Sequence, residues 1–199
     1  MPRRRARRDR AETVTTGHAG GAERRTARIA PALASLLALG GCLARPADGV
    51  LEEACKAQLG VRLTEWTMTS VAADVAAWAH TEGFDPRVAR GDFDGDGRVD
   101  VALLVQARAT PVLQYPERIS ASRVAVCLDR PSGLTVHVID DPYCGDSIRR
   151  ATKGARYHDF ETDAEGVYPS DGVTTVCFGK ASATYVYDGA RFRRIVDGD

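Results

Sequence analysis

Two segments of the chain carry apolar residues at the spacing of an amphipathic helix. The first covers residues 51–59, and Gly60 follows it at a position where many helices end. The second covers residues 71–82, with Ser70 as its N-cap and Gly83 just beyond its last turn. The pattern therefore predicts two helices before residue 84.

From residue 101 onward, apolar residues alternate with polar ones or form short continuous runs, as they do in strands. Asp188 and Gly189 are a strong hairpin turn signal, and residues 130–133 predict a second turn. Residues 107–122 and 140–157 show no clear period and are predicted to be loops. Strands are predicted over residues 101–105, 123–129, 134–139, 173–178, 184–187 and 191–196, and residues 61–68 suit one more.

These elements place the chain in the α+β class, with two N-terminal helices and a mostly antiparallel β-sheet of about five to seven strands. The sequence shows no long internal repeat, and one domain is the default for a chain of this length.

Charge is distributed unevenly between the two ends of the chain. The whole sequence has 27 Lys and Arg against 27 Asp and Glu, yet residues 1–42 hold 9 arginines and three acidic residues. The remainder therefore has 18 basic and 24 acidic residues, a net charge of −6. Because the basic excess lies in the leader, no nucleic-acid partner is expected for the folded part.

The leader has the pattern of an export signal. Arginines precede an apolar run over residues 29–39, which has the length of a signal peptide and is too short to span a bilayer. The run ends in Leu39-Gly40-Gly41-Cys42, which resembles the lipobox of bacterial lipoproteins. The resemblance implies that Cys42 receives a diacylglycerol group and becomes the new N-terminus; ordinary secretion with cleavage nearby is the alternative.

The expected organisation follows from this leader. Residues 1–41 are a signal peptide with a basic n-region, residues 42–49 are the lipidated Cys42 and a tether, and residues 50–199 are a single domain. We expect an exported protein that is anchored in a membrane of the bacterial cell envelope through its lipid, on the periplasmic side.

Four further cysteines form an even set, which suits disulfides in an oxidising compartment. Four cysteines allow three pairings, and the sequence does not select one. A zinc site is the competing interpretation, but no CxxC pair or histidine spacing supports it. The candidate disulfide residues are Cys55, Cys127, Cys144 and Cys177.

An acidic loop precedes the strand predicted at residues 101–105, which we expect to be a central one. Asp92, Asp94 and Asp96 alternate along it, and the glycines between them allow a tight turn. The Arg98 carbonyl and the Asp100 carboxylate continue the series of oxygen ligands, which is typical of Ca²⁺ loops. The twelfth position is not the glutamate of an EF-hand.

The segment from Gly91 to Leu104 resembles the calcium-binding segment of FG-GAP repeats, the integrin α-subunit type that also occurs in bacterial VCBS-type surface proteins. The resemblance implies that Ca²⁺ is bound by Asp92, Asp94, Asp96, the Arg98 carbonyl and Asp100. In those families the motif recurs in each blade of a β-propeller, whereas here it occurs once.

The mutual repulsion of these carboxylates favours a bound cation over a solvated turn that binds nothing, and a structural ion over a catalytic one. A second acidic run, over residues 159–165, lacks the Asp-Gly core and is predicted to be a polar strand edge or loop.

No Gly-x-Ser-x-Gly, HExxH or phosphate-binding loop appears in the sequence. We therefore expect a non-enzymatic, calcium-binding structural or interaction module with an envelope protein or a glycan as its partner. The alternative is a small envelope hydrolase whose acidic loop shapes a metal site.

Overall fold

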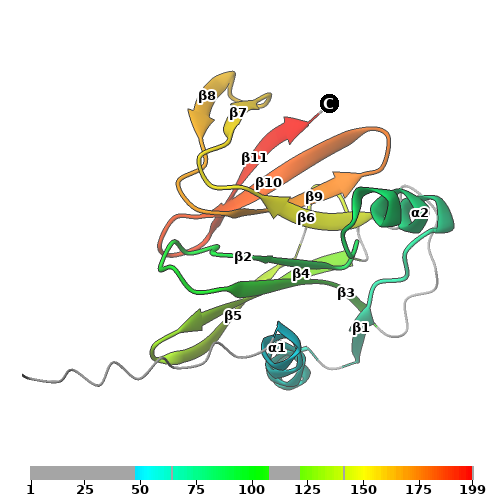
Figure 1. The fold of residues 1–199 in the computed structure, drawn as a ribbon, viewed down its shortest axis with the longest axis vertical. Coiled ribbons are helices and arrows are strands. Elements are labelled where there is room, and N and C mark those ends of the chain that lie inside the picture. Colours follow the sequence, from blue (N-terminus) through cyan, green and yellow to red (C-terminus); the bar gives the residue numbers. More distant parts are fainter. Residues whose placement is uncertain (1–47, 64, 108–121, 141, 199) are drawn as a thin grey trace, which may run out of the picture. The chain divides into compact units, whose positions relative to one another are not determined.

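The computed structural model describes residues 48–63, 65–107, 122–140 and 142–198 (Figure 1). The expected leader, Cys42 and almost all of the expected tether lie outside these residues, as does most of the loop expected at 107–122. The chain separates into two units, Met1–Leu43 and Ala44–Asp199, and every described residue belongs to the second.

The described residues form two helices and eleven strands. The helices are α1 (Asp48–Arg62) and α2 (Ala73–Glu82). The strands are β1 (Trp66–Met68), β2 (Val88–Gly91), β3 (Asp100–Ala107), β4 (Ser122–Arg130), β5 (Gly133–Ile139), β6 (Ser147–Ala151), β7 (Arg156–Asp159), β8 (Ala164–Val167), β9 (Gly172–Cys177), β10 (Ala181–Tyr187) and β11 (Phe192–Gly198).

The strands pair antiparallel in three sheets. The first sheet has the order β1-β3-β4-β5, and β2 also pairs with β3. The second has the order β11-β10-β9-β6, and the third is the hairpin of β7 and β8. The mostly antiparallel α+β fold is thus confirmed, and β3 lies inside its sheet.

The layers are visible in Figure 1, where α1 covers one face of the first sheet and the second sheet covers the other. Side chains of β3 alternate between these layers. Val101, Leu103 and Val105 belong to a buried cluster with residues of α1, while Ala102 and Leu104 belong to one that includes residues of the second sheet. Because both faces of β3 are buried, its sequence is a continuous apolar run.

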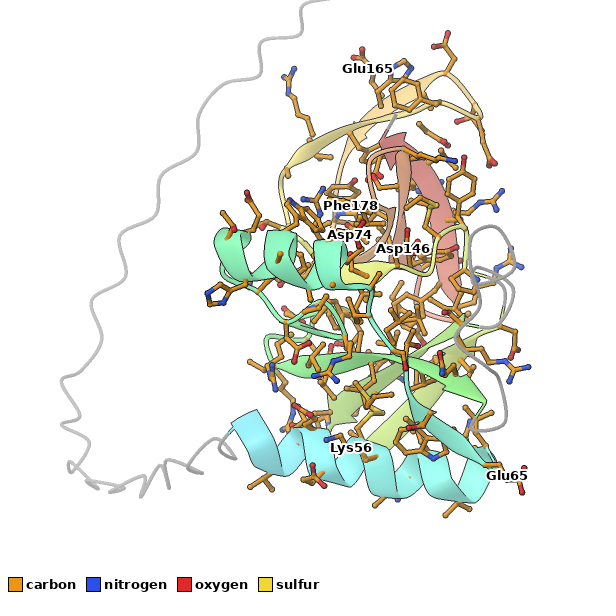
Figure 2. The ribbon with its side chains drawn as sticks, turned by 90° about the vertical axis from the view of Figure 1, so that its right-hand side faces the viewer. Lys56, Glu65, Asp74, Asp146, Glu165 and Phe178 are labelled. Atoms are coloured by element: carbon orange, nitrogen blue, oxygen red, sulfur yellow. A yellow bond between two sulfur atoms is a disulfide. The ribbon has the colours of Figure 1, made fainter. Side chains whose placement is uncertain are left out.

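Figure 2 shows Lys56 of α1 and Glu165 of the β7–β8 hairpin at opposite ends of this stack. The hairpin packs against the second sheet from outside, since Tyr157 and Tyr168 contact the cluster that contains Val186 and Ile195. The tyrosine rings are stacked with their centroids 5.0 Å apart.

Two disulfides join segments that are distant in the sequence. Cys55 and Cys127 join α1 to β4, with their Cα atoms 5.8 Å apart. Cys144 and Cys177 join the segment before β6 to the end of β9, with Cα atoms 4.9 Å apart. The structure confirms the predicted disulfides and selects one of the three pairings that four cysteines allow.

The predicted number of strands was too low because β2, β6, β7 and β8 were missed. These strands have only four or five residues, and β7 and β8 read RYHD and AEGV, which carry no apolar alternation. β2 and β6 contribute Val88, Ala89 and Ile148 to the buried clusters, but each is too short to show a period in the sequence. The acidic run over residues 159–165 spans the β7–β8 turn, in agreement with the predicted polar strand edge or loop.

The helix ends also differ from the prediction. Gly60 lies inside α1, where the buried Leu59 keeps the chain against the sheet and Leu63 N donates to Leu59 O at 2.8 Å. The N-cap of α2 is Ala72 rather than Ser70, without a side-chain hydrogen bond. Neither described helix has the length and apolar character needed to cross a bilayer.

Candidate metal centre

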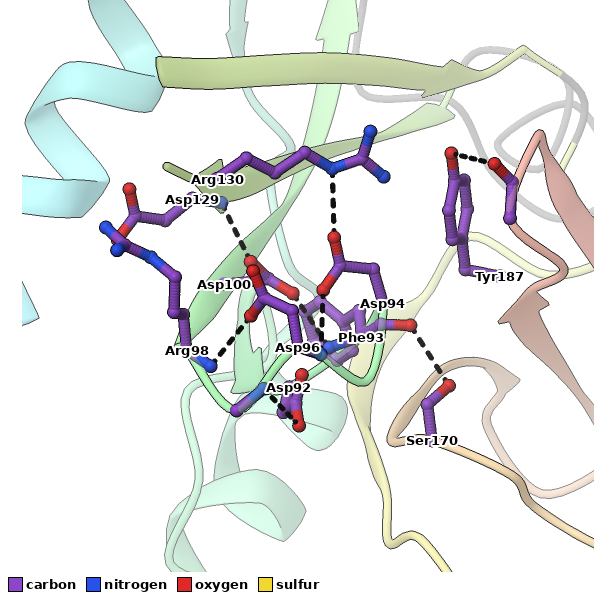
Figure 3. Close-up of polar contacts among 12 residues, drawn as sticks. Asp92, Phe93, Asp94, Asp96, Arg98, Asp100, Asp129, Arg130, Ser170 and Tyr187 are labelled. Carbon is purple, nitrogen blue, oxygen red and sulfur yellow. Dashed lines mark hydrogen bonds and ion pairs between the residues drawn. The ribbon is translucent and has the colours of Figure 1, made fainter. Parts of the chain in front are cut away.

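The acidic loop connects β2 to β3, which are antiparallel neighbours. Gly91 faces Asp100 in their register, so residues 92–99 form the turn of a hairpin. Gly95 and Gly97 have φ angles of 80° and 86°, which favour glycine because it lacks a Cβ atom. The register brings the first and last acidic residues of the loop to the same end of the pair (Figure 3).

Three of the predicted ligands come together. Oxygen atoms of Asp92, Asp94 and Asp100 all lie within 4.8 Å of one another. Two full negative charges at this separation repel by about 3 kcal/mol at an effective dielectric constant of about 20. A divalent cation between the three carboxylates would turn this repulsion into attraction.

Asp100 is the deepest of the three, with no exposed surface. Its two carboxylate oxygens accept hydrogen bonds from the backbone amides of Phe93 and Asp129, both at 2.8 Å. Burial raises the pKa of Asp100 to about 7, against the opposing effect of the two amide donors, and the charge of Asp94 raises it further. Asp100 therefore holds the loop to the end of β4.

Asp94 is nearly as well covered, since 7% of its side chain is exposed. Its Oδ2 accepts from Arg130 Nε at 2.9 Å, and its Oδ1 accepts from Asp96 N at 3.3 Å. The Arg130 guanidinium lies 5.3 Å from the centroid of the Tyr187 ring, which belongs to β10. Asp94 is thus linked through Arg130 to the second sheet.

Asp92 supplies the oxygen that lacks a partner. Its Oδ2 accepts from Gly97 N at 3.1 Å. Its Oδ1 is buried and has no hydrogen-bond partner among the described residues. A buried acceptor without a partner costs about 1–3 kcal/mol, so this atom is a natural position for a cation ligand.

Asp96 does not join the cluster in this structure. The exposed Asp96 accepts from Arg98 N at 2.8 Å, a local turn that Asp readily forms with the backbone two residues on. The Arg98 side chain pairs with Asp129 at 2.7 Å. The sequence spacing did not distinguish these roles for Asp96, because an Asp in this pattern can bind an ion or accept a hydrogen bond from the backbone of its own turn.

Residues far along the chain complete the loop, and sequence reasoning missed them. Ser170 Oγ donates to Phe93 O at 3.0 Å, and Asp171 Oδ2 accepts from Asp92 N at 3.0 Å. Phe93 itself is fully buried in the cluster between the two sheets. The loop is therefore bound on one side to the first sheet and on the other to the segment that leads into β9.

A separate hollow of about 620 Å³ lies beside the β7–β8 hairpin. Tyr157, His158, Glu165, Tyr168 and Asp197 are among its lining residues, and none of its lining residues belongs to the acidic loop. This hollow and the carboxylate cluster are therefore distinct features.

Comparison with protein-family models, with curated proteins and with solved structures finds no match. The geometry of the loop itself shows what it can bind. Hard carboxylate oxygens converge, one of them is buried without a partner, and the surrounding backbone is held from both sheets.

Proposed function

We propose that this protein is a calcium-binding, non-enzymatic structural or interaction module of the bacterial cell envelope. Asp92, Asp94 and Asp100 would bind one Ca²⁺, and Asp96 and the Arg98 carbonyl would turn in to complete its oxygen shell. The unpartnered Oδ1 of Asp92, beside two other carboxylates, is the observation that carries the proposal. Ca²⁺ suits such a loop better than Mg²⁺, because Ca²⁺ accepts six to eight oxygens in flexible geometry.

The ion would be structural. It would neutralise the carboxylates of a loop that contacts both sheets, and so lower the free energy of the folded state. Extracellular calcium modules bind with Kd values of about 10⁻⁴ to 10⁻³ M, which millimolar Ca²⁺ fills. At ten times Kd the bound ion stabilises the fold by roughly 1.4 kcal/mol.

The envelope location is supported by two features. The two disulfides fit an oxidising compartment, and the leader resembles that of a lipoprotein. In this proposal Cys42 carries the lipid anchor, residues 42–49 are the tether, and the partner of residues 50–199 is another envelope protein or a glycan. The resemblance of the loop to FG-GAP segments agrees with a surface role.

The calcium proposal is tested by thermal unfolding of the purified chain, with its disulfides formed, in millimolar Ca²⁺, in Mg²⁺ and in chelator. Ca²⁺ should raise the melting temperature by several degrees, and Mg²⁺ should raise it less. The double variant Asp92→Asn, Asp94→Asn should lose the effect, while Asp140→Asn, whose side chain is 73% exposed, should keep it. Equal melting in Ca²⁺ and chelator, with no heat of Ca²⁺ binding in calorimetry, would overturn the proposal.

The anchoring proposal has its own test. A Cys42→Ser variant should move from the membrane fraction to the soluble fraction of the exporting cell, and its mass should lack the acyl chains. Recovery of an unacylated wild-type chain in the soluble fraction would contradict lipidation and leave the calcium proposal unaffected.

A further inference from the structure

One cation of the protein itself already reaches the acidic loop. Arg130 is the last residue of β4, and its Nε lies 2.9 Å from Asp94 Oδ2 (Figure 3). The pair is partly withdrawn from water, with 30% of the Arg130 side chain and 7% of the Asp94 side chain exposed. Solvent therefore screens this pair less than it screens an ion pair on the open surface.

The end of β4 touches two of the three clustered carboxylates. The backbone amide of Asp129 donates to Asp100, and the side chain of the next residue, Arg130, donates to Asp94. The first contact uses a neutral donor, the backbone amide. The second places a full positive charge directly on a proposed ligand.

The Arg130 guanidinium also contacts an aromatic ring. Its guanidinium carbon lies 5.3 Å from the centroid of the Tyr187 ring, within the range of a cation–π contact. The Tyr187 hydroxyl donates to Gly189 O at 2.9 Å, and the ring packs against Phe192 with centroids 5.2 Å apart. The aromatic partner of Arg130 is thus held in place independently of Asp94.

We infer that Arg130 sets the affinity of the proposed Ca²⁺ site, because its guanidinium competes with the ion for Asp94. This inference rests on the calcium-binding function proposed above. An oxygen that accepts from a guanidinium is a poorer cation ligand, and the guanidinium charge repels an ion bound to the same carboxylate. When Ca²⁺ binds, Arg130 gives up the Asp94 contact and remains over Tyr187.

Arg130 supplies a positive charge that balances the clustered carboxylates when no ion is bound. Without Ca²⁺, Arg130 neutralises part of the carboxylate cluster, so the loop keeps its fold. With Ca²⁺, the ion takes over this role. Arg130 therefore weakens Ca²⁺ binding and lowers the dependence of folding on the ion.

The test compares Ca²⁺ binding by calorimetry in the full chain, with both disulfides formed and at constant ionic strength. Arg130→Gln removes the charge and retains an amide donor for Asp94, so it should bind Ca²⁺ at least about tenfold more tightly. Arg130→Lys keeps a charge and should stay near the wild-type Kd. Arg123→Gln removes an arginine of the same strand that pairs with Asp140 and has 43% of its side chain exposed, so it should also match the wild type.

A structural readout accompanies the binding constants. In the wild type, Ca²⁺ should shift the Arg130 Nε–H resonance away from its Asp94-bonded position, while the Arg123 resonance should not move. If Arg130→Gln does not fold, Arg130→Met serves as the second charge-free variant and should show the same tightening. Circular dichroism checks the fold of each variant.

The outcomes separate the two proposals. If the wild type binds Ca²⁺ and folded charge-free variants bind it with an unchanged or weaker Kd, the role of Arg130 is overturned and the calcium site stands. If neither the wild type nor any variant binds Ca²⁺, the calcium function itself fails. If only Arg130→Gln binds Ca²⁺, the competition by Arg130 is supported, but the calcium-binding function proposed for the wild type is overturned.

Discussion

Asp92 and Asp171 are bonded to each other twice across the two sheets, although 79 positions separate them in the chain. Asp92 N donates to Asp171 Oδ2 at 3.0 Å, and Asp171 N donates to Asp92 O at 3.1 Å. The second carboxylate oxygen of Asp171 accepts from Lys153 N at 2.8 Å. One aspartate outside the acidic loop therefore holds the first residue of that loop in place.

Replacing Asp171 with alanine should destabilise the fold by about 2–3 kcal/mol, because it removes a charged acceptor and leaves two backbone amides without partners. Urea unfolding at neutral pH measures the change. Asp140→Ala is the matched control, since its carboxylate is 73% exposed and pairs with an exposed arginine; it should alter stability by less than about 0.5 kcal/mol. Equal effects of the two substitutions would refute the role given to Asp171.

Gly91 has no room for a side chain. A Cβ atom at this position would lie 2.8 Å from Asp171 Oδ2 and 2.9 Å from Arg150 Cδ. Gly91→Ala should therefore destabilise the protein by about 1–3 kcal/mol. Gly60→Ala should have the opposite sign and stabilise by up to about 1 kcal/mol, because that glycine lies in α1 with nothing within 4 Å of its Cβ position. Thermal unfolding of both variants checks the contrast.

The two disulfides should differ in their contribution to stability. They close loops with sequence separations of 72 and 33 residues. Chain entropy alone then predicts that removing the Cys55–Cys127 bond, as a double Ser variant, costs about 0.7 kcal/mol more than removing Cys144–Cys177. Denaturant unfolding of the two variants without reductant measures this difference. A larger loss for the Cys144–Cys177 variant would show that packing, rather than loop length, dominates.

Asp159 should make the fold sensitive to acid. The Thr162 hydroxyl, and then the backbone amides of Glu161 and Val196, hold the pKa of Asp159 below its usual value. A carboxyl whose pKa is lowered in the folded state stabilises the fold above its unfolded pKa of about 3.9, and this stabilisation is lost as the pH falls through the folded pKa.

Asp159→Asn should therefore lower the free energy of unfolding by about 1 kcal/mol at neutral pH. This difference from the wild type should shrink below about pH 4. Urea unfolding over a pH series measures it. Glu165→Gln, in the neighbouring strand β8, is the control for a carboxylate with an exposed side chain. A difference between Asp159→Asn and the wild type that is constant down to pH 2 would contradict the linkage.

Local signals in the sequence determined several parts of this protein. The hairpins of β4 with β5 and of β10 with β11 follow from their turn residues and alternation, and β3 follows from its apolar run. The tight acidic turn follows from its glycines. These features depend on residues a few positions apart, so neighbouring chemistry is enough to predict them.

Only the tertiary structure decided which cysteines pair, that β2 runs beside β3, and that Asp96 stays apart from the other three carboxylates. It also brought Arg130 and Asp171 to the loop. Each of these contacts joins residues that are distant in sequence or depends on the register of two strands. No local pattern encodes such a contact, because its energy arises only when separate segments pair or pack and remove their polar groups from water.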